Sequence, residues 1–256
     1  MKNKIYLKKI LFLFFFISLP NLVFSDEFIF NSSKIETFEK GNLIKGSGGV
    51  QIQDDTGLTI TSEKFEFDKI KSILKAEENV LAKDTLNENF FKSNKITFFK
   101  KLNTLVSKDK TIIELDSGHI IETSNITYNR NLSKISSNEK TQITDLNNNK
   151  SKMNSFSFST TKKILLASDV QIIDKEGNNY NLKNISYNMR TNEILGKDLS
   201  LNFNSSNFSS NENEPRLKGN SFSLNNNITT VNNGVFTTCK KNNDCPPWVL
   251  KSKIIQ

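Results

Sequence analysis

The sequence predicts an all-β fold, an elongated antiparallel structure built from repeats of about 30 residues, a period typical of stacked repeat architectures. An apolar stretch that leads into an Asp and then a Gly or Asn turn recurs along the chain. A pair of apolar or aromatic residues, one position apart, recurs with the same period. Past the first 25 residues, no stretch shows the sustained helical spacing of apolar residues. Two signals that share one period indicate stacked β-hairpins.

The first 25 residues (1–25) are predicted to be a signal peptide. Four lysines precede the apolar run ILFLFFFISL, and Val23, Phe24 and Ser25 follow where a signal peptidase would cut. The run is short for a membrane span, which needs ~20 apolar residues. A retained N-terminal anchor is the alternative. We therefore expect the mature chain to begin near Asp26, outside the cytoplasm.

The charge balance gives no sign of a nucleic-acid partner. The chain has 35 Lys and Arg against 27 Asp and Glu, and removing the four lysines of the leader leaves 31 basic residues. Basic and aromatic residues do not alternate as they do on a base-stacking surface. The abundance of Lys, Asn, Ile and Phe fits the A/T-rich genome of a bacterium, so we expect a periplasmic or outer-membrane location.

The Asp pattern predicts one hairpin in each repeat. Alternating apolar residues put one face of a strand inward, and an Asp followed by Gly or Asn favours a tight turn. The five copies begin at Val50, Val80, Ile112, Thr141 and Val170, and carry Asp54, Asp84, Asp116, Asp145 and Asp174, the third copy being one residue shorter.

The second pattern, the pairs of apolar or aromatic residues, has the same period as the first. Its pairs advance along the chain by nearly equal steps, which match the steps between the aspartates. A polar turn and another apolar stretch follow each pair, so one unit contains two to three short strands. The pairs are Phe65 and Phe67, Ile96 and Phe98, Ile126 and Tyr128, Phe156 and Phe158, Ile185 and Tyr187, with a looser copy at Phe222 and Leu224.

One repeat cannot bury its own apolar face, so the repeats are expected to stack over a shared core with open edges at both ends. The architecture is either a jellyroll or a roll of two facing sheets. Repeats occupy residues 26–233, and the polar interval 204–216 is interpreted as a loop or insertion, a domain boundary being the alternative. Residues 234–256 form a separate junction.

No group of residues predicts an enzyme. His119 is the only histidine and is expected at the surface or in a turn. Each repeat offers a single turn Asp, whereas Ca²⁺ needs several converging oxygen ligands, so the aspartates are interpreted as turn formers. Cys239 and Cys245 lack a nearby His and make a poor zinc site. In an oxidising compartment they are expected to form a disulfide. No metal or cofactor is expected.

An inward face rich in Phe and Ile is by default a closed core. It becomes a groove for acyl chains if the two sheets splay apart, and spacing alone does not separate the two interpretations. The candidate lining residues are Val50, Ile52, Phe65, Phe67, Ile96, Phe98, Ile126, Tyr128, Phe156, Phe158, Val170, Ile172, Ile185 and Tyr187.

The repeat unit, of the form G-x-V-x-I-x-D-x-x-G followed by S-x-x-F-x-F, resembles the OstA-type repeat of lipopolysaccharide transport proteins over nearly the whole mature chain. This resemblance implies an elongated antiparallel β-jellyroll, open at both ends, that carries lipid A acyl chains inside. It also implies that neighbouring jellyrolls join by edge-strand addition, as in the periplasmic LptA-type bridges.

The tail GVFTTCKKNNDCPPWVLKSKII is similar to the segment that links the jellyroll of LptD-type assembly proteins to their outer-membrane barrel. That resemblance implies disulfides between Cys239 or Cys245 and cysteines of the barrel. No barrel sequence follows Gln256 here, so the two cysteines are expected either to pair with each other or to await partners elsewhere.

Together these features predict the periplasmic N-terminal domain of a lipopolysaccharide assembly protein. Its expected partners are lipopolysaccharide, an LptA-like protein, and an outer-membrane β-barrel with its lipoprotein partner. A free-standing LptA-like bridge is one alternative. A structural β-solenoid surface protein with a dry core and parallel coils is the other.

Overall fold

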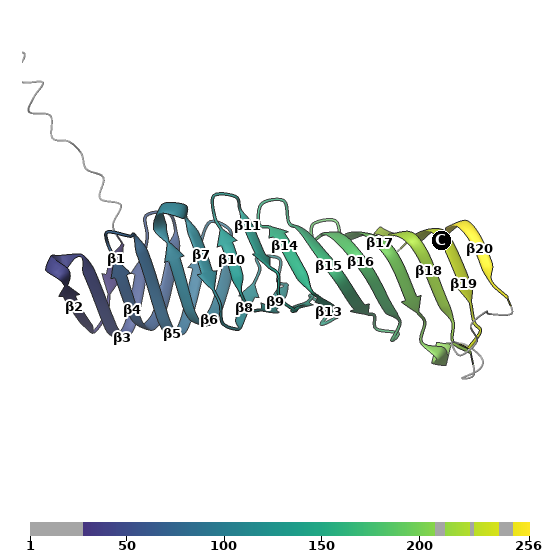
Figure 1. The fold of residues 1–256 in the computed structure, drawn as a ribbon, viewed down its shortest axis with the longest axis horizontal. Helices are drawn as coiled ribbons and strands as arrows, with labels where there is room; N and C mark the ends of the chain where they lie inside the picture. Colours follow the sequence, from purple (N-terminus) through teal and green to yellow (C-terminus); the bar gives the residue numbers. More distant parts are fainter. Residues whose placement is uncertain (1–27, 208–212, 226–227, 241–247) are drawn as a thin grey trace, which may run out of the picture.

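The computed structural model describes residues 28–207, 213–225, 228–240 and 248–256, so the predicted signal peptide and Cys245 lie outside the described residues. The described chain forms one long β structure with its strands stacked across the long axis in sequence order (Figure 1). The first ten strands are β1 (Ile29–Asn31), β2 (Lys34–Phe38), β3 (Leu43–Gln53), β4 (Leu58–Asp68), β5 (Ile73–Asp84), β6 (Asn89–Phe99), β7 (Thr104–Ser107), β8 (Thr111–Glu114), β9 (Ile120–Thr123) and β10 (Ile126–Asn129).

The remaining ten strands continue the same stack. They are β11 (Lys134–Ser137), β12 (Thr141–Thr144), β13 (Lys150–Met153), β14 (Ser155–Ser159), β15 (Ile164–Ile173), β16 (Asn179–Asn188), β17 (Glu193–Asn202), β18 (Arg216–Asn225), β19 (Ile228–Thr237) and β20 (Leu250–Ile255). Three short 3₁₀ turns, η1 (Glu39–Gly41), η2 (Lys100–Leu102) and η3 (Ser205–Asn207), lie between strands. Within the described residues no helix is long and apolar enough to cross a membrane.

Every strand pairing among the described residues is antiparallel. The prediction of an elongated, all-β, antiparallel roll is therefore confirmed, and the parallel coils of the solenoid alternative are wrong. β17 pairs directly with β18 across the polar interval 204–216. β19 includes the first residues of the predicted junction, and β20 adds to it antiparallel, so the described tail continues the sheet.

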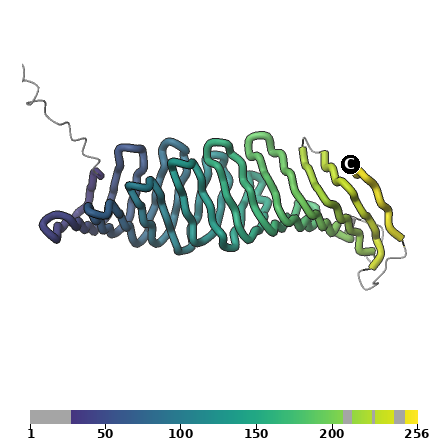
Figure 2. The backbone as a smooth tube through the Cα atoms, turned by 45° about the horizontal axis from the view of Figure 1, so that its top comes forward, coloured from purple at the N-terminus to yellow at the C-terminus, as the bar shows by residue number. Residues whose placement is uncertain are grey.

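Each long strand bends near its middle, and the line of bends forms what we call the spine. Register shifts mark the spine between Ser47 and Val50 and between Glu77 and Val80. In the middle of the chain the bend breaks the strand into two short ones: residues 97–99 of β6 pair with β7, whereas residues 90–92 pair with β8. Bulges of this kind fold one sheet into two facing halves, and Figure 2 shows the resulting roll.

One free edge of the roll carries the turns that contain the repeated aspartates, at 54–58, 84–89, 115–119, 145–149 and 174–178. We call it the acidic rim. In the turn at 145–149, Asp145 Oδ1 accepts hydrogen bonds from the backbone N–H groups of Asn147 and Asn149, both at 2.8 Å. Asp174 does the same for Glu176 and Asn178. These aspartates hold the turns.

The third copy differs from the expected pattern. Its turn begins at Leu115, whose N–H donates to the carbonyl of His119, and Asp116 stands one position later. Gly118 takes the left-handed conformation there, with φ +79°, as Gly57 does in the first copy, with φ +82°. The shorter spacing in the sequence therefore moves the Asp out of the turn-forming position while the turn itself is kept.

The other free edge carries turns at 39–42, 69–72, 100–103, 130–133, 160–163 and 189–192. We call it the basic rim, because each of these six turns contains Lys or Arg. Backbone hydrogen bonds link successive turns. Arg130 N–H donates to the Asn103 carbonyl at 3.0 Å, and Thr160 N–H donates to the Ser133 carbonyl at 2.8 Å. These bonds fix the spacing of repeats along the rim.

Replacing Asp145 with Ala should lower the free energy of unfolding by about 1–2 kcal/mol, because two backbone N–H groups lose their acceptor. Asn147→Ala is the matched control, since Asn147 is exposed and uses only its backbone in the turn; its effect should stay within about 0.5 kcal/mol. Urea unfolding followed by circular dichroism measures both. Equal effects in the two variants would show that Asp145 has no special role in the turn.

Candidate functional site

The candidate lining residues all belong to the interior of the roll. Twelve of the fourteen are at most 7% exposed, and Ile172 and Tyr187 are partly buried against the same core. The alternation read from the sequence therefore picked out the inward face. Whether this interior is a groove or a closed core depends on how the two rims meet.

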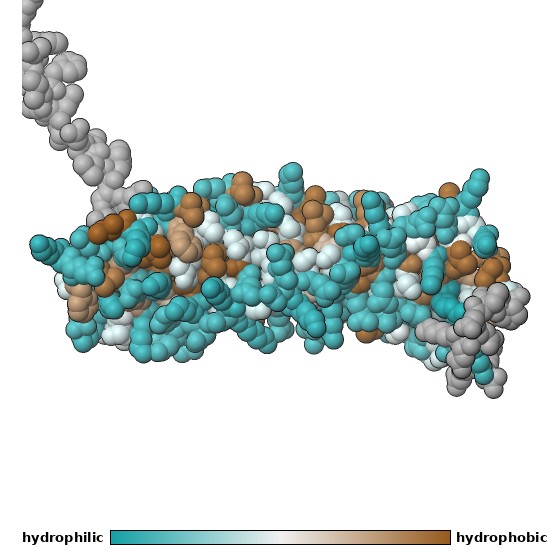
Figure 3. All heavy atoms as spheres, viewed as in Figure 1, coloured by the Kyte–Doolittle hydropathy of each residue, from teal (hydrophilic) through white to brown (hydrophobic). Residues whose placement is uncertain are grey.

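The middle of the roll is closed. Ile113, Ile121, Ile126 and Ile135 are all 0% exposed. The polar groups along the spine there pair with one another: Thr111 Oγ1 donates to Ser107 Oγ at 3.1 Å. Figure 3 shows hydrophilic side chains covering most of one face, with apolar side chains in patches between them. The core in this part of the roll offers no surface to a ligand.

The interior is more open toward the C-terminal end. We call the interior from Val170 to Phe236 the open stretch. Several of its inward apolar residues are buried incompletely, whereas their counterparts in the middle are covered. Partly buried inward residues here are Ile172, Tyr180, Tyr187, Ile194, Phe203, Leu224 and Phe236.

A recess of about 590 Å³ lies in this part of the sheet, lined by Ile185, Gly196 and Phe222 and also by the exposed Leu195 and by Lys197. A Cβ on Gly196 would lie 2.6 Å from Leu182 Cδ2, so only glycine fits at that position without displacing its neighbour. Burial and the nearby Asp174 raise the pKa of Tyr180 to about 12, so its hydroxyl stays neutral. The phenol of Tyr180 therefore adds no charge to the open stretch, whose inward side chains are largely apolar.

The two rims meet across the mouth of the roll in the N-terminal part. Ion pairs of opposite charge join them at Lys100–Asp55 (3.8 Å), Arg130–Asp54 (3.4 Å), Arg130–Asp84 (3.3 Å) and Lys163–Asp116 (2.6 Å). Thr160 Oγ1 also donates to Asn87 Oδ1 at 3.1 Å. We call the interior beneath these contacts the closed stretch.

Arg130 is the centre of these contacts. Its guanidinium donates to Thr56 Oγ1 at 2.6 Å and to the Thr56 carbonyl at 2.8 Å, besides its two aspartates. It also reaches Asn103 Oδ1 at 3.0 Å along its own rim. The side chains of Arg130, Asp54 and Asp84 are 4%, 2% and 0% exposed. Removing one partner of such a buried pair costs about 3–5 kcal/mol, because the other charge stays buried without compensation.

Asp84 is held ionised within this cluster. Burial alone would raise its pKa, but hydrogen bonds from Tyr128, Asn87 and Arg130 outweigh that effect, and the pKa of Asp84 is lowered. Burial, followed by the hydrogen bond to Asp84, raises the pKa of the Tyr128 phenol. Tyr128 was predicted as a lining residue. The structure stacks its ring on Phe91, with centroids 5.1 Å apart, and directs its hydroxyl to Asp84.

The cluster is not fully satisfied. Among the described residues, Arg130 Nε and both side-chain polar atoms of Asn89 are buried without a hydrogen-bond partner. Asn89 is 0% exposed and pairs with Asp84 in the sheet. A buried polar group that lacks a partner costs about 1–3 kcal/mol. The closed mouth therefore includes groups that oppose closure as well as groups that favour it.

His119 was expected at the surface or in a turn. It lies in a turn as predicted, but it is 3% exposed rather than at the surface. Its Nε2 lies 3.2 Å from the Tyr187 hydroxyl on the basic side of the mouth, and its Nδ1 lies 3.1 Å from Ser117 Oγ. Burial lowers its pKa, although Ser117 and Asp145 act in the opposite direction. Sequence pattern gave no sign of the contact with Tyr187, because the two residues are far apart in the chain.

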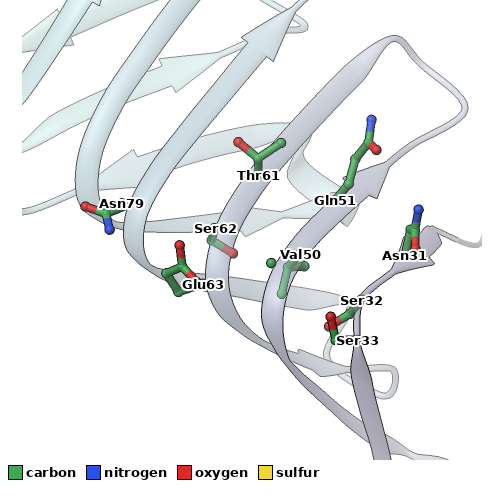
Figure 4. A pocket seen from close by; sticks show the side chains of 10 residues that line it. Asn31, Ser32, Ser33, Val50, Gln51, Thr61, Ser62, Glu63 and Asn79 are labelled. Carbon is green, nitrogen blue, oxygen red and sulfur yellow. The ribbon is translucent and has the colours of Figure 1, made fainter.

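A second cavity, of about 490 Å³, lies at the N-terminal end beside the spine. Figure 4 shows the side chains around it on four neighbouring segments: Ser32 and Ser33 before β2, Gln51 on β3, Ser62 and Glu63 on β4, and Asn79 on β5. Its lining is mostly uncharged and polar, and Ser32 Oγ and Ser33 Oγ already donate to backbone carbonyls. This cavity has no converging charges and is not the candidate site.

The outermost strands leave backbone groups unpaired among the described residues. β2 pairs only with β3, and β20 pairs only with β19. Apolar side chains on both strands are exposed, including Ile35 and Phe38 on β2 and Leu250 and Ile254 on β20. Cys239 is half-buried near the start of β20, with its Sγ 3.9 Å from the Trp248 carbonyl; its disulfide partner stays a prediction.

Comparisons with known proteins give no relative. No protein-family model matches the chain, and no curated protein is significantly similar to it. Within the described residues, no three His, Cys, Asp or Glu side chains gather as metal ligands would. The interior and the two rims are therefore the features of the molecule that bear on its function.

His119 predicts a pH dependence of folding. Because its pKa is lowered in the folded state, the unfolded chain binds a proton that the folded chain excludes, and stability falls as pH drops below about 6.5, the ordinary value for histidine. Urea unfolding at a series of pH values from neutral to mildly acidic measures this dependence. His119 is the only histidine, so His119→Gln should flatten the curve in that range. An unchanged curve in the variant would assign the dependence to the carboxylates.

Proposed function

We propose that this protein binds the acyl chains of lipopolysaccharide in its interior and passes them along the roll in the periplasm, as the periplasmic domain of an outer-membrane assembly system. The observation that carries the proposal is the open stretch. Each of its five long strands carries at least one apolar inward residue that is only partly buried, beside buried ones such as Val170 and Phe222. Contiguous apolar surface that the protein does not cover itself is typical of a binding site.

The mechanism is passive. Each methylene group of an acyl chain that leaves water for the interior contributes about 0.8 kcal/mol, so a chain of ordinary length gains enough to hold the lipid without a charged contact. The inward faces of β15 to β19 continue from strand to strand, which gives a bound chain a path with no large polar step. Head groups would remain at the mouth, outside the apolar interior.

Edge strands provide the proposed means of assembly. β2 and β20 offer backbone donors and acceptors to an incoming strand, the mode known as β-augmentation. An LptA-like protein would add at one end, and an outer-membrane barrel with its lipoprotein would follow at the other. The resemblance of the tail to LptD-type proteins supports this orientation. The resemblance of the repeat unit supports a free-standing bridge as much as it supports an LptD-type domain.

A structural protein with a dry interior is the second candidate. The closed stretch favours it, because the isoleucines there are fully buried within the protein. Such a protein would bind no acyl chain at any point along the roll. The two candidates therefore differ in what the open stretch contacts.

Adjacent residues on β15 provide the test. Ile172 packs inward and is partly buried, whereas Ile173 is 51% exposed on the outer face. A photo-crosslinking amino acid at position 172 should capture lipopolysaccharide on irradiation, and the same residue at position 173 should not. Immunoblotting for lipopolysaccharide on the purified protein measures the adduct.

The pair at 172 and 173 also controls for nonspecific contact with micelles. Equal capture at both positions would indicate adsorption to the surface. No capture at either position, with the protein folded, would favour the structural candidate.

A further inference from the structure

The contacts between the rims change abruptly along the roll. Ion pairs join the rims at the acidic turns 54–58, 84–89 and 115–119. Among hydrogen bonds and ion pairs between described residues, none joins the acidic turns at 145–149 and 174–178 to the basic rim. The mouth is therefore bridged in one half of the molecule and unbridged in the other.

Charge in the sequence follows the same division. Basic residues occupy the basic rim up to Arg190, and the sequence that joins β18 to β19, NNNI at 225–228, contains no charge. Arg190, the last of these, donates to the Thr161 carbonyl of its own rim at 2.7 Å, so the ion pairs across the mouth between described residues lie only at the first three acidic turns.

The basic rim contributes only side chains to the bridge. Arg130 spans the mouth from a turn, not from within a strand, so its release does not break the sheet. Its Nε and the side chain of Asn89 lack partners in the closed arrangement, and both would gain water on opening. The aspartates it binds would be solvated as ions once exposed.

We propose that Arg130, with Asp54, Thr56 and Asp84, forms a lateral latch that closes the N-terminal part of the groove and confines a bound acyl chain to the open stretch. This inference rests on the proposed function, since it assumes that the open stretch holds acyl chains. Transfer of a chain through the closed stretch then requires the latch to open. The latch makes the two halves of the roll unequal: one stores the lipid and the other admits it only transiently.

Tryptophan fluorescence can show where a bound acyl chain lies in the interior. Trp248 is the only tryptophan, so Trp248→Phe gives a silent background. Phe222→Trp reports on the open stretch, and Phe91→Trp reports on the closed stretch directly beneath Tyr128. A dibrominated stearate quenches a tryptophan that its acyl chain contacts. We expect quenching at position 222 and none at position 91.

Opening the latch should change only the quenching of the tryptophan at position 91. In an Arg130→Met background, quenching at position 91 should rise to the level at position 222, while quenching at 222 stays the same. Arg190→Met is the matched control, because Arg190 lies on the same rim but donates to Thr161 of its own rim; position 91 should remain unquenched. If Arg130→Met does not fold, Thr56→Val takes its place, because it removes the 2.6 Å hydrogen bond from Arg130 to Thr56 Oγ1. If Phe91→Trp does not fold, Phe98→Trp takes its place.

The outcomes separate the latch from the proposed function. Quenching at 91 equal to that at 222 in the parent protein would overturn the latch and support acyl binding. The latch would also be overturned if Arg130→Met left quenching confined to position 222. It would likewise be overturned if Arg190→Met raised quenching at position 91 as much as Arg130→Met does. No quenching at either position in any variant would overturn both the latch and the proposed function.

Discussion

The structure depends on a stagger between its two rims. An acidic-rim residue meets a basic-rim turn that lies well beyond its own repeat, as in Asp55 with Lys100 and Asp116 with Lys163. Thr56 reaches still further along the chain, to Arg130. Because all of these separations exceed the length of one repeat, every cross-mouth contact joins different repeats. Closure is thus a property of successive repeats together and never of one alone.

The stagger also explains the N-terminal end. The basic-rim turns at 39–42 and 69–72 lie too early in the chain to face an acidic turn. β1 pairs with the acidic half of β3 instead, and aromatic rings fill the space. Phe28 packs edge-on against Phe67 with centroids 5.0 Å apart, and Lys100 lies 4.7 Å from the Phe28 ring centroid. An aromatic contact there replaces the ion pairs found further along.

Local features were predictable from the sequence and long-range ones were not. The repeat, the turn aspartates and the inward face follow from alternation and turn chemistry, which act over a few residues. The role of Arg130 depends on Asp54 and Asp84, which belong to earlier repeats, and the burial of His119 depends on Tyr187. One signal was available: Arg130 is one of only three arginines, and it stands in a turn whose neighbours on the rim are also basic. Pairing those turns with the acidic ones requires the stagger, which spacing within one repeat does not contain.

The hydrogen bonds that link successive turns of the basic rim restrict how such a chain can change in length. Loss or gain of one whole repeat leaves every remaining turn on its own rim. A change of half a repeat would exchange the rims for everything downstream, placing acidic turns in line with basic ones and disrupting the bonds between turns. Duplication of whole repeats is therefore the tolerated route. The position of an added repeat determines whether the bridged or the unbridged part of the molecule becomes longer. The capacity of the interior can therefore evolve without a change at either end.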